Sequence, residues 1–302
     1  MTADSNTATK KTAKPPNIWL LGMRPRTLTM AAVPVTVGAA LAWAADINPD
    51  WLTFIATLAC AVLIQIGTNL LNDAKDGERG ADGPDRIGPL RITGAGLAKP
   101  KQVRRAALAC FVAALIAGLY LVFVGGMPIL LIGLASLVSG YAYSSGRRPL
   151  SHGPFSEIYV IVFFGLIAVA GSYYLQSGQA PDGAVLLTGI AIGCYAAAVL
   201  LVNNLRDTAA DLRAGRRTLA GRLGTEATRI LYGFLVLVPF PLLAAAWGVQ
   251  MLGLAWLSLP VCLWLVLRFA RLQVGPGMNA QLGRTAMVQV LVGALLMLEH
   301  LS

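Results

Sequence analysis

Two clusters of acidic and amide side chains have matching spacing and stand after two different apolar segments. The first reads Asn72-Asp73-x-x-Asp76, and the second reads Asn203-x-x-x-Asp207-x-x-x-Asp211. Residues four apart share one face of a helix, so each Asn aligns with an Asp if the helix continues past its apolar part. Oxygen ligands of this kind suit Mg²⁺, which proteins usually hold with one or two carboxylates plus substrate phosphates and water. The two clusters therefore predict a magnesium and phosphate site, provided that the fold brings them together.

Basic side chains near the clusters offer partners for the phosphate. Lys99, Arg91, Arg147 and Arg206 are the candidates, and an arginine can meet a phosphate bidentately. Two facing pairs of carboxylates repel each other unless cations lie between them, and two Mg²⁺ ions bridging a diphosphate would balance that charge. The alternative is that the acids only cap helices or pair with arginines that anchor loops. The repeated, helically phased spacing favours the metal site.

The elements that carry these clusters are expected to be membrane helices. The 302 residues are 56% hydrophobic and 13% charged, with a mean hydropathy of +0.67. A hydrocarbon core of about 30 Å takes roughly 20 apolar residues as helix, and helices satisfy their own backbone polar groups in lipid. The sequence predicts an all-α polytopic membrane protein with nine spans, at roughly 27–45, 52–72, 105–125, 127–144, 155–175, 184–204, 229–247, 251–269 and 284–301.

The distribution of positive charge predicts the orientation of the spans. With the N-terminus in the cytoplasm, all 24 Lys and Arg lie on the cytoplasmic side and the opposite loops hold none. Both acidic clusters then emerge on the cytoplasmic side, after the second and sixth spans, where one cavity of the bundle can receive them. The net charge of +10 therefore reflects topology, and nucleic-acid binding is not expected.

The rest of the chain shows one membrane domain and no separate soluble one. Residues 1–18 are expected to be a disordered polar tail without a cleavable signal peptide, and 19–302 a single transmembrane domain with cytoplasmic loops at about 73–104 and 205–228. The four cysteines all fall inside predicted spans without the spacing of metal ligands. They are expected to be small buried residues rather than a disulfide or zinc site.

The motifs resemble those of the UbiA superfamily of intramembrane aromatic prenyltransferases, from Trp19 onward. The run from Asn69 to Asp82, with the following Asp85-Arg-Ile-Gly-Pro-Leu-Arg91, is similar to the menaquinone branch of that family. So is the run from Asn203 to Ala220, with its Gly-Arg-Arg-Thr-Leu-Ala ending. The resemblance implies a nine-helix bundle around a central cavity. It also implies transfer of a polyprenyl group from polyprenyl diphosphate to 1,4-dihydroxy-2-naphthoate, with loss of CO₂ and diphosphate, in the plasma membrane.

The resemblance also implies roles for individual residues. Asp76, Asp207 and Asp211 would hold Mg²⁺ on the diphosphate, while Asn72 and Asn203 would bind a diphosphate oxygen or metal-bound water. Asp73 is either a further ligand or a neighbour that tunes the others. Tyr143 and Arg147 match a Tyr-x-x-x-basic element that touches diphosphate, and Arg91, Lys99 and Arg206 are expected nearby. Many relatives have a third acid where this chain has Gly80, and Asp82 is the candidate replacement.

Three other functions remain open at this stage. Another UbiA-type transferase would use a different acceptor, such as 4-hydroxybenzoate. A cation-coupled transporter would also carry acids in its spans, although here the acids stand at one membrane face and among bases. A non-catalytic scaffold of a prenyl-lipid pathway would leave the repeated Asn-x-x-x-Asp spacing without a reason. The sequence does not determine the oligomeric state or the length of the prenyl chain.

Overall fold

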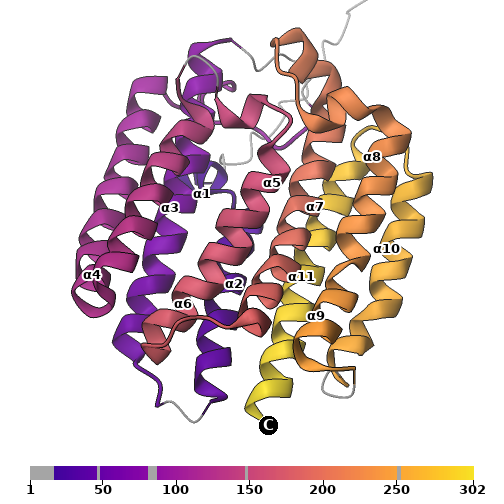
Figure 1. Cartoon of the computed structure of the whole chain (residues 1–302). Coiled ribbons are helices and arrows are strands. Elements are labelled where there is room, and N and C mark those ends of the chain that lie inside the picture. Colours follow the sequence, from indigo (N-terminus) through magenta and orange to yellow (C-terminus); the bar gives the residue numbers. More distant parts are fainter. Residues whose placement is uncertain (1–16, 46–47, 81–86, 147–148, 250–252) are drawn as a thin grey trace, which may run out of the picture.

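The computed structural model describes residues 17–45, 48–80, 87–146, 149–249 and 253–302, and within these ranges the regular elements are all helical. The chain forms a bundle of long helices (Figure 1). In order, the main elements are α1 (Ile18–Met23), α2 (Pro25–Trp43), α3 (Trp51–Glu78), α4 (Pro100–Ser144), α5 (Ser156–Ile161), η2 (Val162–Ile167), α6 (Ala168–Ser177), α7 (Gly183–Arg213), α8 (Leu219–Leu237), α9 (Pro239–Trp247), α10 (Leu259–Arg271) and α11 (Gly277–Leu301).

Seven segments of the described chain are long and apolar enough to span a membrane. They account for eight of the nine predicted spans, because α4 is 45 residues long and contains two of them. The backbone leaves the helical conformation at Gly126 (φ 65°), and Pro128 follows. The chain reverses there, so that Val103 near the start of α4 packs beside Leu70 while Tyr143 near its end lines the cavity described below.

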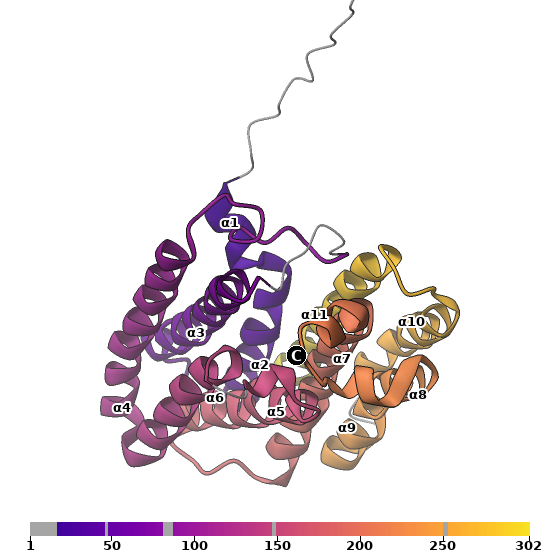
Figure 2. The same cartoon turned by 90° about the horizontal axis from the view of Figure 1, so that it is seen from above.

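The remaining predicted span, 251–269, corresponds to a short 3₁₀ turn, η4 (Ala255–Ser258), followed by α10. At 13 residues, α10 is shorter than the roughly 20 residues that a full crossing takes. Seen from above, α1 to α6 lie on one side and α8 to α10 on the other, with α7 and α11 between them (Figure 2). The central position of α7 explains why 78% of its most apolar window is buried, a larger share than in any other candidate span.

Glycines allow the closest helix crossings of the bundle. A Cβ atom on Gly38 of α2 would lie 2.2 Å from the backbone oxygen of Val169 on α6. A Cβ on Gly165 in the π-helical turn η2 would lie 2.4 Å from the backbone oxygen of Gly189 and 2.6 Å from Cα of Gly193, both on α7. In lipid the hydrophobic effect does not drive helices together, and small residues instead let the helix backbones approach closely. These contacts hold α6 and η2 directly against the two helices beside them.

One buried side chain ties three segments together at the end of the bundle where α3 begins. Gln176 of α6 accepts hydrogen bonds from Trp43 Nε1 (2.8 Å) and from the backbone N–H of Asp50 (3.1 Å), and its amide donates to the Asp50 carbonyl. Asp50 in turn caps α3 by accepting from the backbone N–H of Thr53. The helix α3 therefore starts from a defined position, which sets where its other end, with Asn72 and Asp76, is placed.

Candidate active site

Both sequence clusters lie on helices that continue past their apolar parts, as the phasing predicted. α3 ends at Glu78 and α7 at Arg213, so Asn72 and Asp76 share one helix with the second span, and Asn203, Asp207 and Asp211 share one with the sixth. These five residues line a single cavity of about 280 Å³. The loops that follow α3 and α7 lie at the same end of the bundle, away from the C-terminus (Figure 1).

Arginines join the two clusters inside the cavity. Arg91, from the loop after α3, places Nη1 2.5 Å from Oδ2 of Asp76 and donates to the backbone oxygen of Asn72 (3.1 Å). Arg216, from the loop after α7, pairs with the other oxygen of Asp76, and its Nη1 lies 3.4 Å from Oδ1 of Asp211. Asp76 is 1% exposed. A buried carboxylate needs such partners, because removing a charge from water is costly.

Arg206 binds side chains of the second cluster. Its guanidinium contacts both carboxylate oxygens of Asp207, at 2.8 and 2.6 Å, and also donates to Oδ1 of Asn203 (2.7 Å) and Oδ1 of Asn279 on α11 (2.8 Å). Arg206 is buried and is not among the residues that line the cavity. Its contacts are therefore those of a positioning residue, which fixes Asp207 and Asn203 rather than reaching a phosphate as the sequence suggested.

Asp73 has a different environment from Asp76. Its carboxylate accepts hydrogen bonds from the backbone N–H groups of Ile92 (3.1 Å) and Thr93 (3.0 Å) and from the Thr93 hydroxyl, and that hydroxyl also contacts the Asp73 carbonyl. Asp73 is buried and does not line the cavity. The structure thus places it as the anchor of the loop that carries Arg91, not as a ligand facing the cavity.

The remaining predicted residues are placed as follows. Tyr143 lines the cavity, whereas Lys99 is exposed at the start of α4 and does not. Arg147 and Asp82 lie outside the described residues. Gly80 follows α3 with a φ of 64°, a left-handed conformation that favours glycine and has open space around it. Gly80, where the family resemblance led us to expect a third acid, therefore lies past the end of α3 at Glu78.

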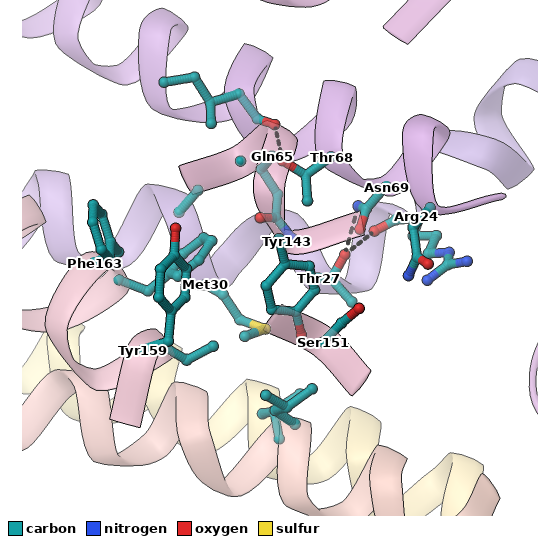
Figure 3. Close-up of a pocket in the computed structure, with 18 of the residues that line it drawn as sticks. Arg24, Thr27, Met30, Gln65, Thr68, Asn69, Tyr143, Ser151, Tyr159 and Phe163 are labelled. Carbon is teal, nitrogen blue, oxygen red and sulfur yellow. Dashed lines mark hydrogen bonds between the residues drawn. The ribbon is translucent and has the colours of Figure 1, made fainter. Parts of the chain in front are cut away.

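A second wall of the cavity carries residues whose role the motifs did not indicate. Arg24 adopts a left-handed backbone conformation (φ 53°) between α1 and α2, and its carbonyl accepts from the Thr27 hydroxyl (2.9 Å). Asn69 donates to Thr27 Oγ1 (3.1 Å) and to the Met23 carbonyl (3.0 Å). Figure 3 shows this group at one end of the pocket and Phe163 at the other, with Tyr143 and Tyr159 between them. Such backbone strain in a non-glycine residue is common at binding sites.

Aromatic rings line the cavity between this wall and a deeper, mainly apolar part. The ring centroids of Tyr143 and Tyr159 are 6.0 Å apart, and those of Tyr159 and Phe163 are stacked at 4.5 Å. Beyond them the cavity runs between α3, α4 and α6, where its walls are mainly apolar or small side chains, including Cys60, Ile64, Leu121, Gly133, Ile167 and Gly171. The cavity thus combines a charged end with an apolar depth, and can hold a molecule with a charged head and a long apolar tail.

Arg216 and Glu157 also lie at the site although the sequence pattern did not single them out. The signal for Arg216 was its place in the Gly-Arg-Arg-Thr-Leu-Ala ending of the second motif, which was used as a family signature and not assigned to the site. Glu157 on α5 is buried and accepts from Asn204 Nδ2 (2.8 Å) and the Ser156 hydroxyl (2.9 Å). Asn204 lines the cavity, so Glu157 fixes that wall from outside it.

The residues facing the cavity fit a divalent cation only together with a further ligand. Within the described ranges, no three His, Cys, Asp or Glu side chains form a preassembled metal group. Asp76, Asp207 and Asp211 nevertheless face one cavity with oxygen atoms alone, and Mg²⁺ commonly completes such a set with substrate phosphate and water. Nε of Arg216 is buried at the cavity and has no hydrogen-bond partner among the residues that the structure describes. An anionic oxygen entering the cavity would satisfy it.

Comparison with known families identifies the chain. The model of the UbiA prenyltransferase family matches residues 31–281, which include all five cluster residues that line the cavity. The chain belongs to the UbiA prenyltransferase family. Among solved structures of this fold, a UbiA homolog from Archaeoglobus fulgidus bound to GPP and Mg²⁺ is similar over 95% of this chain and 100% of that one. The TM-score is 0.67 and the sequence identity 15%.

Two relatives with higher sequence identity have names that specify a narrower function. The 1,4-dihydroxy-2-naphthoate octaprenyltransferase of Mycobacterium tuberculosis is 39% identical over 221 residues, which are 73% of this chain and 74% of that protein. The protein of the same name from Escherichia coli is 38% identical over 225 residues, 72% of each chain. These relatives therefore confirm the resemblance of the two acidic motifs to the menaquinone branch of the family.

Proposed function

We propose that this protein transfers a polyprenyl group from polyprenyl diphosphate to 1,4-dihydroxy-2-naphthoate, releasing diphosphate and CO₂ and giving demethylmenaquinol, the reduced form of demethylmenaquinone. The proposal rests on one cavity, which has Asp76, Asp207 and Asp211 at one end and mainly apolar walls at the other. The names of the M. tuberculosis and E. coli relatives support the choice of acceptor.

In this proposal the three cavity-lining aspartates hold Mg²⁺ on the diphosphate, with two ions as the expected number. Asn72 and Asn203 line the same end and bind a diphosphate oxygen or metal-bound water. Arg91 and Arg216 carry positive charge there and pair with the aspartates. Binding of Mg²⁺ together with the negatively charged diphosphate would keep the charges of the site balanced.

The chain's own residues would then favour loss of the diphosphate. Asp76, Asp207 and Asp211 would hold Mg²⁺, which would stabilise the charge that develops on the leaving diphosphate, and arginines in a site with little water would add to that effect. The aromatic faces of Tyr143, Tyr159 and Phe163 line the path between the charged end and the apolar depth. Such faces attract an allylic cation, and the apolar walls keep water away from it.

Arg24 is the residue that we assign to the acceptor's carboxylate. It lines the cavity on the wall formed by the start of α2, together with Thr27 and Asn69. A guanidinium there would pair with a carboxylate and orient the naphthalene ring toward Tyr143. The ring carbon that bears the carboxylate would then attack the allylic cation, and CO₂ would leave.

The proposal includes a location in the plasma membrane with the acidic end of the cavity facing the cytoplasm. The positive-inside distribution of all 24 basic residues supports that orientation. The prenyl tail would extend along the cavity between α3, α4 and α6, whose outer faces would contact lipid.

A turnover assay with two acceptors tests the function. Purified protein given polyprenyl diphosphate, Mg²⁺ and 1,4-dihydroxy-2-naphthoate should form demethylmenaquinol and release CO₂, while 4-hydroxybenzoate should give little product. Asp76→Ala or Asp207→Ala should each lower turnover by about 100-fold or more without unfolding the bundle. The matched control is Glu226→Ala, an acid 82% exposed on α8. Preference for 4-hydroxybenzoate would overturn the acceptor, and full activity of either aspartate variant would overturn the site.

A further inference from the structure

Arg216 occupies the position between the acidic clusters where a cation is required. Its guanidinium pairs with Asp76 of the first cluster and lies 3.4 Å from the carboxylate of Asp211 in the second. The side chain is 12% exposed, and the carboxylates that it bridges are 1% and 11% exposed. The ion pairs are therefore largely shielded from water, which makes each of them stronger than a surface pair.

The same carboxylate oxygens cannot pair with Arg216 and coordinate a divalent ion at full strength. A Mg²⁺ ion bound to Asp76 and Asp211 would stand next to the guanidinium, and like charges at such a separation repel strongly where water is scarce. Arg91 already neutralises the other oxygen of Asp76. Binding of the metal therefore requires the Arg216 guanidinium to move away from the two carboxylates. Without a new partner, the buried guanidinium would then have no counter-ion.

The local structure gives Arg216 a second partner to move to. The arginine follows Gly215, whose φ of 72° ends α7, and its backbone N–H donates to the Asp211 carbonyl (2.8 Å). The Arg216 side chain therefore extends from the end of α7 into the cavity. Its Nε is buried there and has no hydrogen-bond partner within the described part of the chain, while its two Nη atoms contact the acids. A diphosphate oxygen in the cavity would offer this donor an acceptor and the guanidinium a counter-ion.

We propose that Arg216 is a built-in counter-ion that joins Asp76 to Asp211 before the metal binds and moves to the diphosphate as the metal binds. The inference rests on the proposed metal–diphosphate site and adds its order of events. Metal alone competes with Arg216 and binds weakly. Diphosphate draws the guanidinium away from the acids, so metal and diphosphate strengthen each other's binding through one side chain.

The experiment is a titration of the full-length protein in detergent with Mn²⁺, followed by the electron paramagnetic resonance signal of free Mn²⁺, without and with inorganic pyrophosphate. Affinities must be corrected for Mn²⁺–pyrophosphate complexes in solution. In the wild type, protein-bound pyrophosphate should tighten Mn²⁺ binding. In Arg216→Gln, Mn²⁺ alone should bind about five- to tenfold more tightly than in the wild type, and the gain from pyrophosphate should fall by a similar factor. Arg217→Gln, an exposed neighbour, is the matched control and should behave as the wild type.

Thermal unfolding in EDTA gives a second readout. Without Arg216 the buried carboxylates of Asp76 and Asp211 lose a shared partner, so Arg216→Gln should unfold at a lower temperature than the wild type in EDTA. Mn²⁺ should restore more stability to that variant than to the wild type, because binding to the native state adds to stability. If Arg216→Gln does not fold, Arg216→Lys should show the same changes in smaller size, since one ammonium cannot bridge both carboxylates as a guanidinium does.

The outcomes separate this inference from the function on which it rests. Mn²⁺ affinity that is unchanged or weaker in both Arg216 variants, with an undiminished effect of pyrophosphate, would overturn the counter-ion role while leaving the metal site in place. Failure of the proposed site itself would look different. In that case Asp76→Ala and Asp207→Ala would bind Mn²⁺ and pyrophosphate as well as the wild type.

Discussion

Asp73 and Asp76 stand three residues apart on α3 and have unlike partners. Asp73 accepts only hydrogen bonds, from the Ile92 and Thr93 backbone and the Thr93 hydroxyl, whereas Asp76 faces the cavity between two arginines. A helix turns by about 100° per residue, so residues three apart diverge by some 60° in direction. That divergence is sufficient for one carboxylate to hold a loop and the other to line a cavity.

Asp73→Asn should therefore cost stability rather than metal affinity. The amide accepts fewer of the three hydrogen bonds and leaves buried donors poorly satisfied, which costs about 1–3 kcal/mol in free energy of unfolding. Thermal unfolding would show the loss, and Mn²⁺ titration should show an affinity close to that of the wild type. Asp76→Asn is the matched comparison and should lose most of its Mn²⁺ affinity. Loss of Mn²⁺ binding without loss of stability in Asp73→Asn would assign Asp73 to the metal instead.

His152 connects the loops on the acidic side of the bundle. Its Nε2 lies 3.3 Å from Nη1 of Arg79, and its carbonyl accepts from the backbone N–H of Arg217 (2.9 Å). Burial, together with the positive charges of Arg216 and Arg79, lowers the pKa of His152 from 6.5 to about 4. The histidine is therefore neutral in the folded protein at neutral pH, and Nε2 can accept a hydrogen bond from Arg79.

This low pKa predicts a pH dependence of stability. The folded protein binds the His152 proton less tightly than the unfolded chain does, so the contribution of His152 is fully present above pH 6.5. It is lost progressively as the pH falls from 6.5 toward 4. Unfolding temperatures of the wild type and His152→Gln should differ in their pH dependence in this window, with the variant losing less on acidification. Equal losses in both proteins would contradict the prediction.

At the scale of elements, the crossing of η2 with α7 decides where the aromatic wall of the cavity lies. Phe163 and Phe164 belong to η2 and line the cavity, while Gly165 packs against the backbone of α7 at Gly189 and Gly193. The π-helical turn adds a residue to the helical repeat, a feature often found at functional sites. The close approach and the widened turn together aim the two rings inward.

Gly165→Val should force this crossing apart. The new side chain would meet backbone atoms 2.4 to 2.8 Å away, and backbone cannot yield as a flexible side chain can. We expect a loss of about 3 kcal/mol in unfolding free energy, at the upper end for overpacked sites, and a raised KM for the prenyl diphosphate in what remains folded. Gly118→Val on α4 is the control, because a Cβ there has no neighbour within 4 Å. Equal stability of the two variants would contradict the role given to the crossing.

For the whole molecule, the prediction concerns orientation. Lys101 at the start of α4 and Gln179 between α6 and α7 are both exposed and lie at opposite ends of the bundle. With the acidic end in the cytoplasm, a membrane-impermeant maleimide should label Gln179→Cys but not Lys101→Cys in intact right-side-out vesicles. Inverted vesicles should give the reverse pattern. The native cysteines lie on membrane-spanning or buried segments, and a cysteine-free background removes any labelling of them. Labelling of Lys101→Cys from outside would invert the topology.

Much of the bundle follows from local sequence. Apolar segments of spanning length, the positive-inside bias and the Asn-x-x-x-Asp spacing indicated membrane helices and two acidic clusters on helical ends, because these properties depend only on composition and helical periodicity. The family was recognisable from its resemblance to the residue sequences of the two motifs, Asn69 to Asp82 and Asn203 to Ala220. The break between the predicted spans 105–125 and 127–144 is also confirmed, because the backbone of α4 leaves the helical conformation at Gly126.

The sequence by itself determined that this protein is an α-helical membrane protein with two helix-borne acidic motifs of the UbiA type. Only the tertiary structure decided which charged groups face one another. Asp73 holds a loop, Arg206 supports Asp207, Lys99 is exposed, and Arg216 joins the two clusters. The physical reason is that helical phase specifies a direction but not a partner. The partner depends on how distant segments pack and on which buried charges need neutralising there.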